Sequence, residues 1–330
     1  MKAAIKTLGR LAFGLVLFVF VGWQAAEAGD YVCRDKLGRV ITLQVPVKRA
    51  VMNQMYDFIP ALNLWDQVAG LNRWAFEDEI LNALCPELER RYARIGTGSE
   101  INMERLIKLR PDVIVTWTSK PEQIHFIGRQ GIPVIGVYPE SLREFYSVID
   151  MLGAVFGREA EARRLKQRMN AEFKLIQPRV AGIQHKRKVV WLGSRPTYPS
   201  AGIGINDELI RLAGAVNPAG TIKQRNVEVS LEQLIKWNPD VIFIWGNAGY
   251  TAADLRAKPQ WRVIKAVREG RVYKAPEFST WSPLLAPVAL WVAVRIYPEA
   301  FGDIDFDARA DRFCRDIYGF SIKRIGGFVD

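Results

Sequence analysis

The stretch N-M-E-R-L-I-K-L-R-P-D-V-I-V-T-W, residues 102–117, is repeated as S-L-E-Q-L-I-K-W-N-P-D-V-I-F-I-W, residues 230–245. The copies stand 128 positions apart, and nine of their sixteen positions are identical. Each copy predicts a helix that begins after a capping residue, Asn102 or Ser230, because both side chains can accept a hydrogen bond from a first-turn amide. A Pro-Asp turn ends the helix, since the residue before proline is disfavoured in helical geometry. An unbroken apolar strand follows, as in sheets covered on both faces. Two copies predict two similar lobes.

The rest of the chain continues the alternation of short apolar strands and helices. The first half predicts a hairpin at 31–43, strands at 49–52, 67–71 and 133–137, and helices at 58–64, 77–91 and 121–129. The second half predicts strands at 188–192 and 271–274, and helices at 206–213, 284–296 and 307–318. This order is typical of two Rossmann-like α/β lobes.

One segment breaks the alternation. No strand pattern occurs between residues 141 and 176, where apolar residues recur at helical spacing and a second helical stretch follows Gly157. The segment predicts a helical connector, which is stiffer than a Gly/Ser coil. We therefore expect a lobe at 29–140, a connecting helix at 141–182 and a second lobe at 183–330.

Residues 1–28 have the pattern of a secretory signal peptide. Three cationic side chains (Lys2, Lys6 and Arg10) precede an apolar run at 11–21, and an A-x-A cleavage signal ends at Ala28. The run is short for a membrane span, although an uncleaved anchor is the alternative. We expect a soluble exported protein that begins at Gly29.

Charge and cysteine content narrow the function classes. The formal charge of +11 becomes +9 without residues 1–28, and the basic residues are scattered. A scattered positive charge favours an anionic ligand or an acidic partner surface over nucleic acid. The alternative is that the charge only keeps the protein soluble. The cysteines Cys33, Cys85 and Cys314 form no C-x-x-C pair, which argues against a zinc or redox motif. An oxidising compartment permits one disulfide, and Cys33 with Cys85 is the only pair within one predicted lobe.

Catalytic constellations are scarce. His125, in a predicted helix, and His185, in a basic turn, are the only histidines, too few for a His-rich metal site. The G-x-G pairs at 96–98 and 202–204 lack the third glycine of the dinucleotide fingerprint, and no G-K-[ST] loop occurs. No motif indicates an enzyme, although an exported enzyme remains the alternative, and we expect no cofactor and no metal site. In open α/β sheets, ligands bind beyond the carboxyl ends of the strands.

The order of these features resembles the periplasmic substrate-binding proteins of ABC importers for ferric siderophores, haem and cobalamin. The similarity runs from D-K-L-G-R-V near the start of the mature chain to the closing helices. Its most specific parts are I-N-M-E-R-L-I-K-L-R-P-D-V-I-V, G-I-P-V, S-A-G-I-G-I-N-D-E-L-I-R-L-A-G-A-V-N, E-V-S-L-E-Q-L-I-K-W-N-P-D-V-I and W-R-V-I-K-A-V-R-E-G-R-V-Y. The resemblance implies a monomer with two α/β lobes joined by one long helix, the class III architecture, and a ligand in the cleft.

The resemblance also implies a contact with a membrane permease. Each lobe of these proteins presents a surface glutamate to arginines of the permease, and the motif places these at Glu104 and Glu232, the identical acids of the repeat. The alternative is that a first-turn carboxylate merely complements the helix dipole, which contributes a few tenths of a kcal/mol.

The family's cleft loops map onto residues 53–56, 96–99, 117–119, 195–198, 225–226, 245–247 and 278–281. The predicted ligand-binding residues are Asn53, Tyr56, Trp117, Thr118, Arg195, Tyr198, Arg225, Trp245, Asn247 and Trp281. The tryptophans suit stacking on a flat ligand, and the arginines suit carboxylates, catecholates or an oxyanion. The tyrosines suit hydrogen bonding or, when deprotonated, ligation of haem iron. The alternatives are tryptophans that cap the sheets and arginines that only face solvent.

The resemblance favours an iron complex as ligand, foremost a ferric siderophore. Gly98 stands where some corrinoid binders have an aromatic residue, and S-P-L-L-A-P after Trp281 lacks the arginine often found after that Ser-Pro. Molybdate, tungstate, haem and corrinoids are the alternatives for the same kind of importer. A chelatase-like enzyme is the alternative of another class, and the two poorly placed histidines disfavour it.

Overall fold

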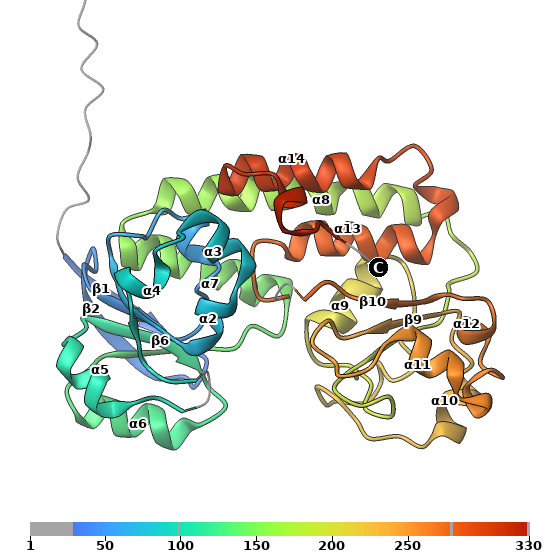
Figure 1. The fold of residues 1–330 in the computed structure, drawn as a ribbon, viewed down its shortest axis with the longest axis horizontal. Helices are drawn as coiled ribbons and strands as arrows, with labels where there is room; N and C mark the ends of the chain where they lie inside the picture. The colour runs from blue at the N-terminus through green and yellow to red at the C-terminus, as the bar shows by residue number, and fades with distance from the viewer. Residues whose placement is uncertain (1–28, 98–99, 278–279, 329–330) are drawn as a thin grey trace, which may run out of the picture.

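The structure is a computed structural model that describes residues 29–97, 100–277 and 280–328. The signal peptide predicted at 1–28 lies outside the described residues. Two α/β lobes stand side by side, and the long helix α8 (Glu159–Val180) runs along one side of both, with α14 (Phe306–Tyr318) beside it (Figure 1). The predicted fold class of two α/β lobes is confirmed.

The N-terminal lobe is built on a five-stranded parallel sheet in the order β5-β4-β3-β6-β7. Its strands are β3 (Ala50–Met52), β4 (Val68–Leu71), β5 (Ala93–Arg94), β6 (Val113–Trp117) and β7 (Val134–Val137). An antiparallel hairpin of β1 (Gly29–Arg34) and β2 (Val40–Val45) precedes the sheet. The helices of the lobe are α1 (Phe58–Ala61), α2 (Arg73–Glu77), α3 (Glu79–Leu84), α4 (Leu88–Arg91), α5 (Met103–Leu109) and α6 (Pro121–Arg129).

The C-terminal lobe has a three-stranded parallel sheet in the order β10-β9-β8. Its strands are β8 (Val189–Leu192), β9 (Val241–Ile244) and β10 (Val272–Lys274). Its helices are α9 (Ile205–Leu212), α10 (Leu231–Trp237), α11 (Ala252–Ala257), α12 (Lys265–Arg268) and α13 (Leu285–Ile296), with 3-10 turns η1 (Pro259–Trp261), η2 (Pro298–Ala300) and η3 (Ile322–Ile325).

Two helices, not one, form the segment between the sheets. Helix α7 (Leu142–Phe156) ends at Gly157, whose left-handed φ of 63° turns the chain into α8. Helix α8 packs against both α7 and α13. One continuous hydrophobic cluster includes Met52 of the first sheet, Met169 of α8 and Phe243 of the second sheet. The lobes are therefore joined by a packed core as well as by the chain.

The repeated stretch forms the predicted helix, turn and strand in both lobes. Asn102 accepts a hydrogen bond from the amide of Arg105 at 2.9 Å, and Ser230 accepts one from Gln233 at 3.2 Å. Each helix ends at a left-handed residue, Arg110 with φ 46° or Asn238 with φ 44°. The helix therefore stops by a left-handed turn just before the proline.

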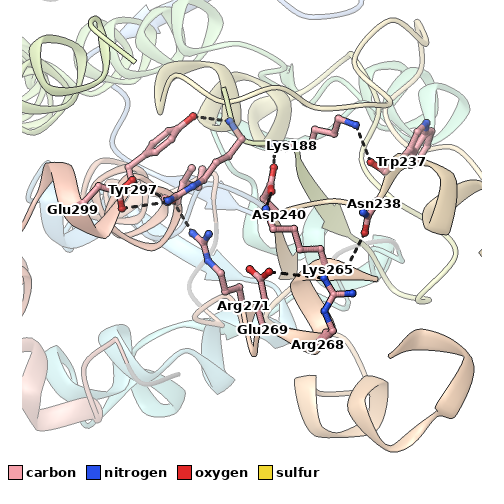
Figure 2. Close-up of polar contacts among 12 residues, drawn as sticks. Lys188, Trp237, Asn238, Asp240, Lys265, Arg268, Glu269, Arg271, Tyr297 and Glu299 are labelled. Atoms are coloured by element: carbon pink, nitrogen blue, oxygen red, sulfur yellow. Dashed lines mark hydrogen bonds and ion pairs between the residues drawn. The ribbon is translucent and has the colours of Figure 1, made fainter. Parts of the chain in front are cut away.

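The paired aspartates of the repeat fix the start of a neighbouring strand. Asp112 accepts hydrogen bonds from the amides of Lys48 and Arg49, both at 2.9 Å, just before β3. Asp240 accepts one from the amide of Lys188 at 2.8 Å, just before β8, and pairs with the ammonium of Lys265 at 2.7 Å (Figure 2). The identical acids hold the amino-terminal edge of each sheet.

Three local predictions need correction. The single helix expected at 77–91 is two short helices, α3 and α4, and α2 precedes them and ends at Glu77. The break after α2 arises because Asp78 has extended backbone and accepts a hydrogen bond from the amide of Leu81, which caps α3. The short elements β5 and α11 were not predicted, since neither is long enough to show a period. The Cys33–Cys85 disulfide that an oxidising compartment would permit is not formed, because all three cysteines are free. Cys33 lies on the hairpin beside α7, whereas Cys85 ends α3.

Within the described ranges, no helix is long and apolar enough to cross a membrane.

Candidate ligand cleft between the lobes

Strand ends from both sheets meet at one cavity of about 750 Å³. From the N-terminal lobe, Tyr56 follows β3, and Trp74 and Asp78 follow β4. From the C-terminal lobe, Trp245 and Asn247 follow β9, and Glu277 follows β10. This is where an open α/β sheet binds ligands, beyond the carboxyl ends of its strands.

Two exposed tryptophans, one from each lobe, line this cavity. Trp74 is 49% exposed and Trp245 is 43% exposed, which is unusual for large aromatic side chains. The rings offer flat apolar area on which a ligand can stack.

The cavity is acidic although the protein is basic. Its lining contains four carboxylates, Glu77, Asp78, Glu79 and Glu277, and no lysine, arginine or histidine among the described lining residues. Arg73 lies next to the lining and pairs with Glu77 at 3.3 Å. The net charge of the chain therefore does not describe the charge of the cleft.

Burial and mutual repulsion shift the pKa values at this wall. Burial raises the pKa of Asp78 to about 6, although the Leu81 amide opposes the shift. Burial and then the charge of Asp78 raise the pKa of Asp57 well above its usual range. Burial, followed by the charges of Asp57, Asp78 and Glu77, raises the pKa of the Tyr56 phenol. Tyr56 is thus a neutral hydrogen-bonding group, and this environment opposes a phenolate ligand for iron.

A second set of predicted residues forms a contact across the lobes. The rings of Trp117, Tyr138 and Trp281 lie 5.2 to 5.4 Å apart in all three pairings. The indole of Trp281 donates a hydrogen bond to the carbonyl of Pro139 at 2.9 Å. Trp117 and Trp281 are therefore in contact with each other across the lobes.

Charged residues extend this contact. Arg225 pairs with Glu140 at 2.5 Å, and its guanidinium lies 4.1 Å from the centre of the Tyr138 ring. Lys36 pairs with the same carboxylate at 2.8 Å. Burial opposes ionisation of Glu140, but hydrogen bonds from Lys36 and Arg225 outweigh it and lower the pKa. A small cavity beside the contact is lined by Glu140, Arg225 and Trp281.

The remaining predicted ligand-binding residues lie outside the acidic cavity. Asn53 is fully buried and donates a hydrogen bond to Thr116 at 2.8 Å. Thr118 is half-buried, and its amide bonds to the carbonyl of Val137 at 3.3 Å. Arg195 pairs with Glu228 at 2.6 Å and lies 5.2 Å from the Tyr198 ring. Residues 98–99 and 278–279 of the predicted cleft loops lie outside the described residues.

Sequence reasoning thus brought Tyr56, Trp245 and Asn247 to one cavity but missed its acidic side. Trp74 and the carboxylates at 77–79 follow the predicted strand 67–71 directly. The strand-exit rule that selected Trp245 would have selected Trp74 as well. These three carboxylates were instead placed in the single helix predicted at 77–91.

The two predicted docking glutamates occupy equivalent places. Glu104 and Glu232 are exposed in the first turns of α5 and α10. These helices lie on the side of the molecule opposite α8 and α14 (Figure 1). A hydrogen bond with the Ser230 hydroxyl lowers the pKa of Glu232.

Another cavity, of about 570 Å³, lies at the amino-terminal edge of the second sheet and is basic. Several of its cations already have structural partners there. Arg187 pairs with Glu299 at 2.9 Å. Lys265 pairs with Asp240 at 2.7 Å (Figure 2). These contacts hold the sheet edge against the end of α13.

The described residues contain no group of three or more histidine, cysteine or acidic side chains arranged to hold a metal ion. The four acids of the cleft therefore do not form a coordination sphere.

Comparison with known proteins places the chain. A family model described as a periplasmic binding protein matches residues 58–277. The molybdate-binding protein MolA of Haemophilus influenzae is 26% identical over 328 residues, covering 89% of this chain and 92% of that protein. The Fe(3+)-citrate-binding protein YfmC of Bacillus subtilis is 29% identical over 265 residues, covering 76% and 79%.

Solved structures agree on the fold. The Helicobacter pylori CeuE nickel–histidine complex has a TM-score of 0.81 at 22% identity, covering 92% of this chain and 100% of that chain. MolA of Haemophilus influenzae bound to molybdate has a TM-score of 0.76 at 24% identity, covering 88% and 99%. The chain, matched across both lobes, belongs to the periplasmic binding protein family.

Proposed function

We propose that this protein captures a metal chelate, foremost a ferric siderophore or related iron complex, between its lobes and delivers it to an ABC importer. Binding proteins of this family deliver ligands to the permeases of such importers. They are solute-binding proteins rather than enzymes. We propose that the protein is exported to the periplasm by the signal peptide at 1–28 and acts there as a monomer.

The observation that carries the proposal is the 750 Å³ cavity with a tryptophan from each lobe. A space of this size suits a chelate of several hundred daltons, since pockets for ligands of that class span roughly 300 to 1,000 Å³. A bare oxyanion would leave most of it filled with water. Tyr56 and Asn247 add hydrogen-bonding groups at the wall.

The relatives support metal-containing ligands without choosing among them. Names in the family include binders of ferric citrate, vitamin B12 and molybdate. Molybdate or tungstate, haem and a corrinoid are therefore the alternative ligands for the same kind of transport. Size favours the chelates over the oxyanions in the acidic cavity.

The delivery step rests on the two glutamates of the repeat. We propose that Glu104 and Glu232 contact basic residues of the permease, one from each lobe. Their equivalent positions, exposure and common side of the molecule support this assignment. Both carboxylates also complement their helix dipoles, so transport must be measured separately from stability.

Native mass spectrometry of protein purified from its own periplasm is the direct test of the ligand. We expect an added mass that contains iron. Trp74→Ala and Trp245→Ala should each weaken that binding about tenfold or more, because each removes a wall of the cavity. Phe126→Ala on α6 is the control, since Phe126 is similarly exposed, at 42%, and does not line the cavity.

A contrary result is equally clear. If the purified protein carries no ligand and binds no ferric hydroxamate, ferric citrate, haem, cobinamide or molybdate, the transport proposal fails. Tight binding of molybdate and of none of the chelates would show that the ligand is an oxyanion rather than a metal chelate.

A further inference from the structure

We propose that the cleft selects a ligand with a positively charged face, such as a cationic metal chelate or one that carries a free amine. This inference rests on the proposed function and names the charge class of its ligand. It reverses what the net charge of the chain suggests.

Carboxylates from both lobes surround the cavity. Glu77 ends α2, Asp78 caps α3, and Glu79 begins α3. Glu277 comes from the opposite lobe, after β10. A ligand between the lobes would therefore have acids on both sides, and a cationic face would match both.

Little positive charge compensates these acids. Arg73 pairs with Glu77, but both side chains are more than 40% exposed, so water screens the pair. Two arginines predicted to bind an anion are engaged with other acids, Arg195 with Glu228 and Arg225 with Glu140. An anionic chelate entering this cavity would meet carboxylates without a described cation in the lining.

The aromatic walls favour the same sign of charge. The face of a tryptophan ring attracts cations, with an energy of about 0.5 to 2 kcal/mol depending on exposure. Trp74 already accepts one, because the guanidinium of Arg73 lies 4.3 Å from the centre of its ring. Trp245 presents an exposed ring at the other wall.

The acids would act on the whole complex rather than on its metal. No set of three acidic, histidine or cysteine side chains in the described ranges is arranged to coordinate an ion. The metal therefore keeps the chelating groups of the ligand, and the carboxylates of the protein interact with the charge on the surface of that ligand.

Three ferric trihydroxamates separate charge from shape. Ferrioxamine B carries a terminal ammonium, its N-acetyl derivative is uncharged there, and its N-succinyl derivative carries a carboxylate. We expect affinities measured by calorimetry to fall in that order, by roughly threefold to tenfold at each step, where tenfold is about 1.4 kcal/mol. Higher salt should narrow the difference, because exposed charges are screened.

The triple variant Glu77→Gln, Glu79→Gln and Glu277→Gln should remove most of this preference, so that its affinities for the ammonium and succinyl forms differ by less than about threefold. The control is Glu87→Gln with Glu89→Gln. These two exposed acids lie in the N-terminal lobe at the spacing of Glu77 and Glu79, and they do not line the cavity. Equal affinities for the three chelates, or tighter binding of the succinyl form, would overturn the inference.

Quenching of tryptophan fluorescence tests the charge without any chelate. The signal of Trp74 and Trp245 is obtained by subtracting the spectrum of the variant with both changed to phenylalanine. The triple glutamine variant should lower quenching by caesium and raise quenching by iodide at these rings. Unchanged quenching would show that the three glutamates set no negative potential at the two tryptophan rings, even if a chelate binds. The expected change would support a negative potential in the cavity even if all three hydroxamates fail to bind and the proposal of an iron ligand is wrong.

Discussion

Arg225 of the C-terminal lobe pairs with Glu140, which follows the last strand of the N-terminal sheet, at 2.5 Å. The same guanidinium lies 4.1 Å from the ring of Tyr138, which in turn packs against Trp281. This contact lines a small cavity of its own and shares no lining residue with the acidic cavity. The relationship assigns Trp117, Arg225 and Trp281 to contact between the lobes in this state of the protein.

Arg225→Ala should lower the free energy of unfolding by about 1 kcal/mol or less, because the Arg225 side chain is half exposed. The radius of gyration from solution scattering should stay unchanged, since the lobes also share a core around α8. Arg195→Ala is the control. It removes a pair and a ring contact of the same kind within one lobe. A large expansion of Arg225→Ala alone would show that the contact, rather than the core, holds the lobes.

Glu104→Lys combined with Glu232→Lys should abolish uptake and leave ligand affinity within about twofold. Charge reversal would place lysines opposite the basic residues of a permease, and like charges at an interface cost several kcal/mol. Uptake of the labelled ligand by cells and calorimetry of the purified variant are the two measurements. Glu122→Lys with Glu269→Lys controls for charge reversal at exposed acids of each lobe. Normal uptake by the first variant would leave the glutamates only the role of complementing the helix dipoles.

Asp78→Asn should stabilise the protein at pH 8 by roughly 1 to 3 kcal/mol and have little effect at pH 3, as measured by urea unfolding. The folded pKa of about 6 lies above the ordinary value of 3.8, so the folded state binds the proton more tightly than the unfolded state. Stability is therefore lost as the pH rises from 3.8 to 6, and the amide removes this loss.

Asparagine can still cap α3 at position 78, so the helix is retained. Asp305→Asn is the control, because Asp305 caps α14 in the same way but is exposed. A stabilisation at pH 8 that is equally large in both variants would reflect the cap rather than the buried carboxyl.

Asp240→Ala should cost about 2 to 3 kcal/mol, because it leaves the Lys188 amide and the Lys265 ammonium without their acceptor. Asp112→Ala should cost less, since it removes two amide contacts at an exposed site. Burial opposes ionisation of Asp240, but hydrogen bonds from Lys265 and Lys188 outweigh it and lower the pKa. The difference between wild type and Asp240→Ala should therefore be complete above pH 4 and shrink as the pH falls below 3.8. A difference that does not shrink in acid would indicate lost packing instead.

The elements were predictable where the local signal was strong. The helix at 121–129 has both predicted bounds, because Pro121 begins it and apolar residues recur along one face. The helix boundaries between residues 73 and 91 were not predictable, since the three helices there have only four to six residues each and show no period. Asn53 likewise looked like a cleft residue at the end of a strand, yet its side chain turns inward to Thr116.

The sequence by itself determined the doubling of the α/β unit, the helical segment between the halves and the family. These follow from periodicity, capping residues and a repeated motif, which act between residues close together in the chain. Only the tertiary structure decided which strand-exit loops share a cavity and what charge that cavity has. Glu77 and Glu277 lie 200 positions apart in the chain, and packing of the two lobes brings both to one cavity. The net charge is a sum over the whole chain. A bound ligand interacts mainly with the charged groups that line its cavity, because more distant charges are screened, and the charged groups of this lining are acidic.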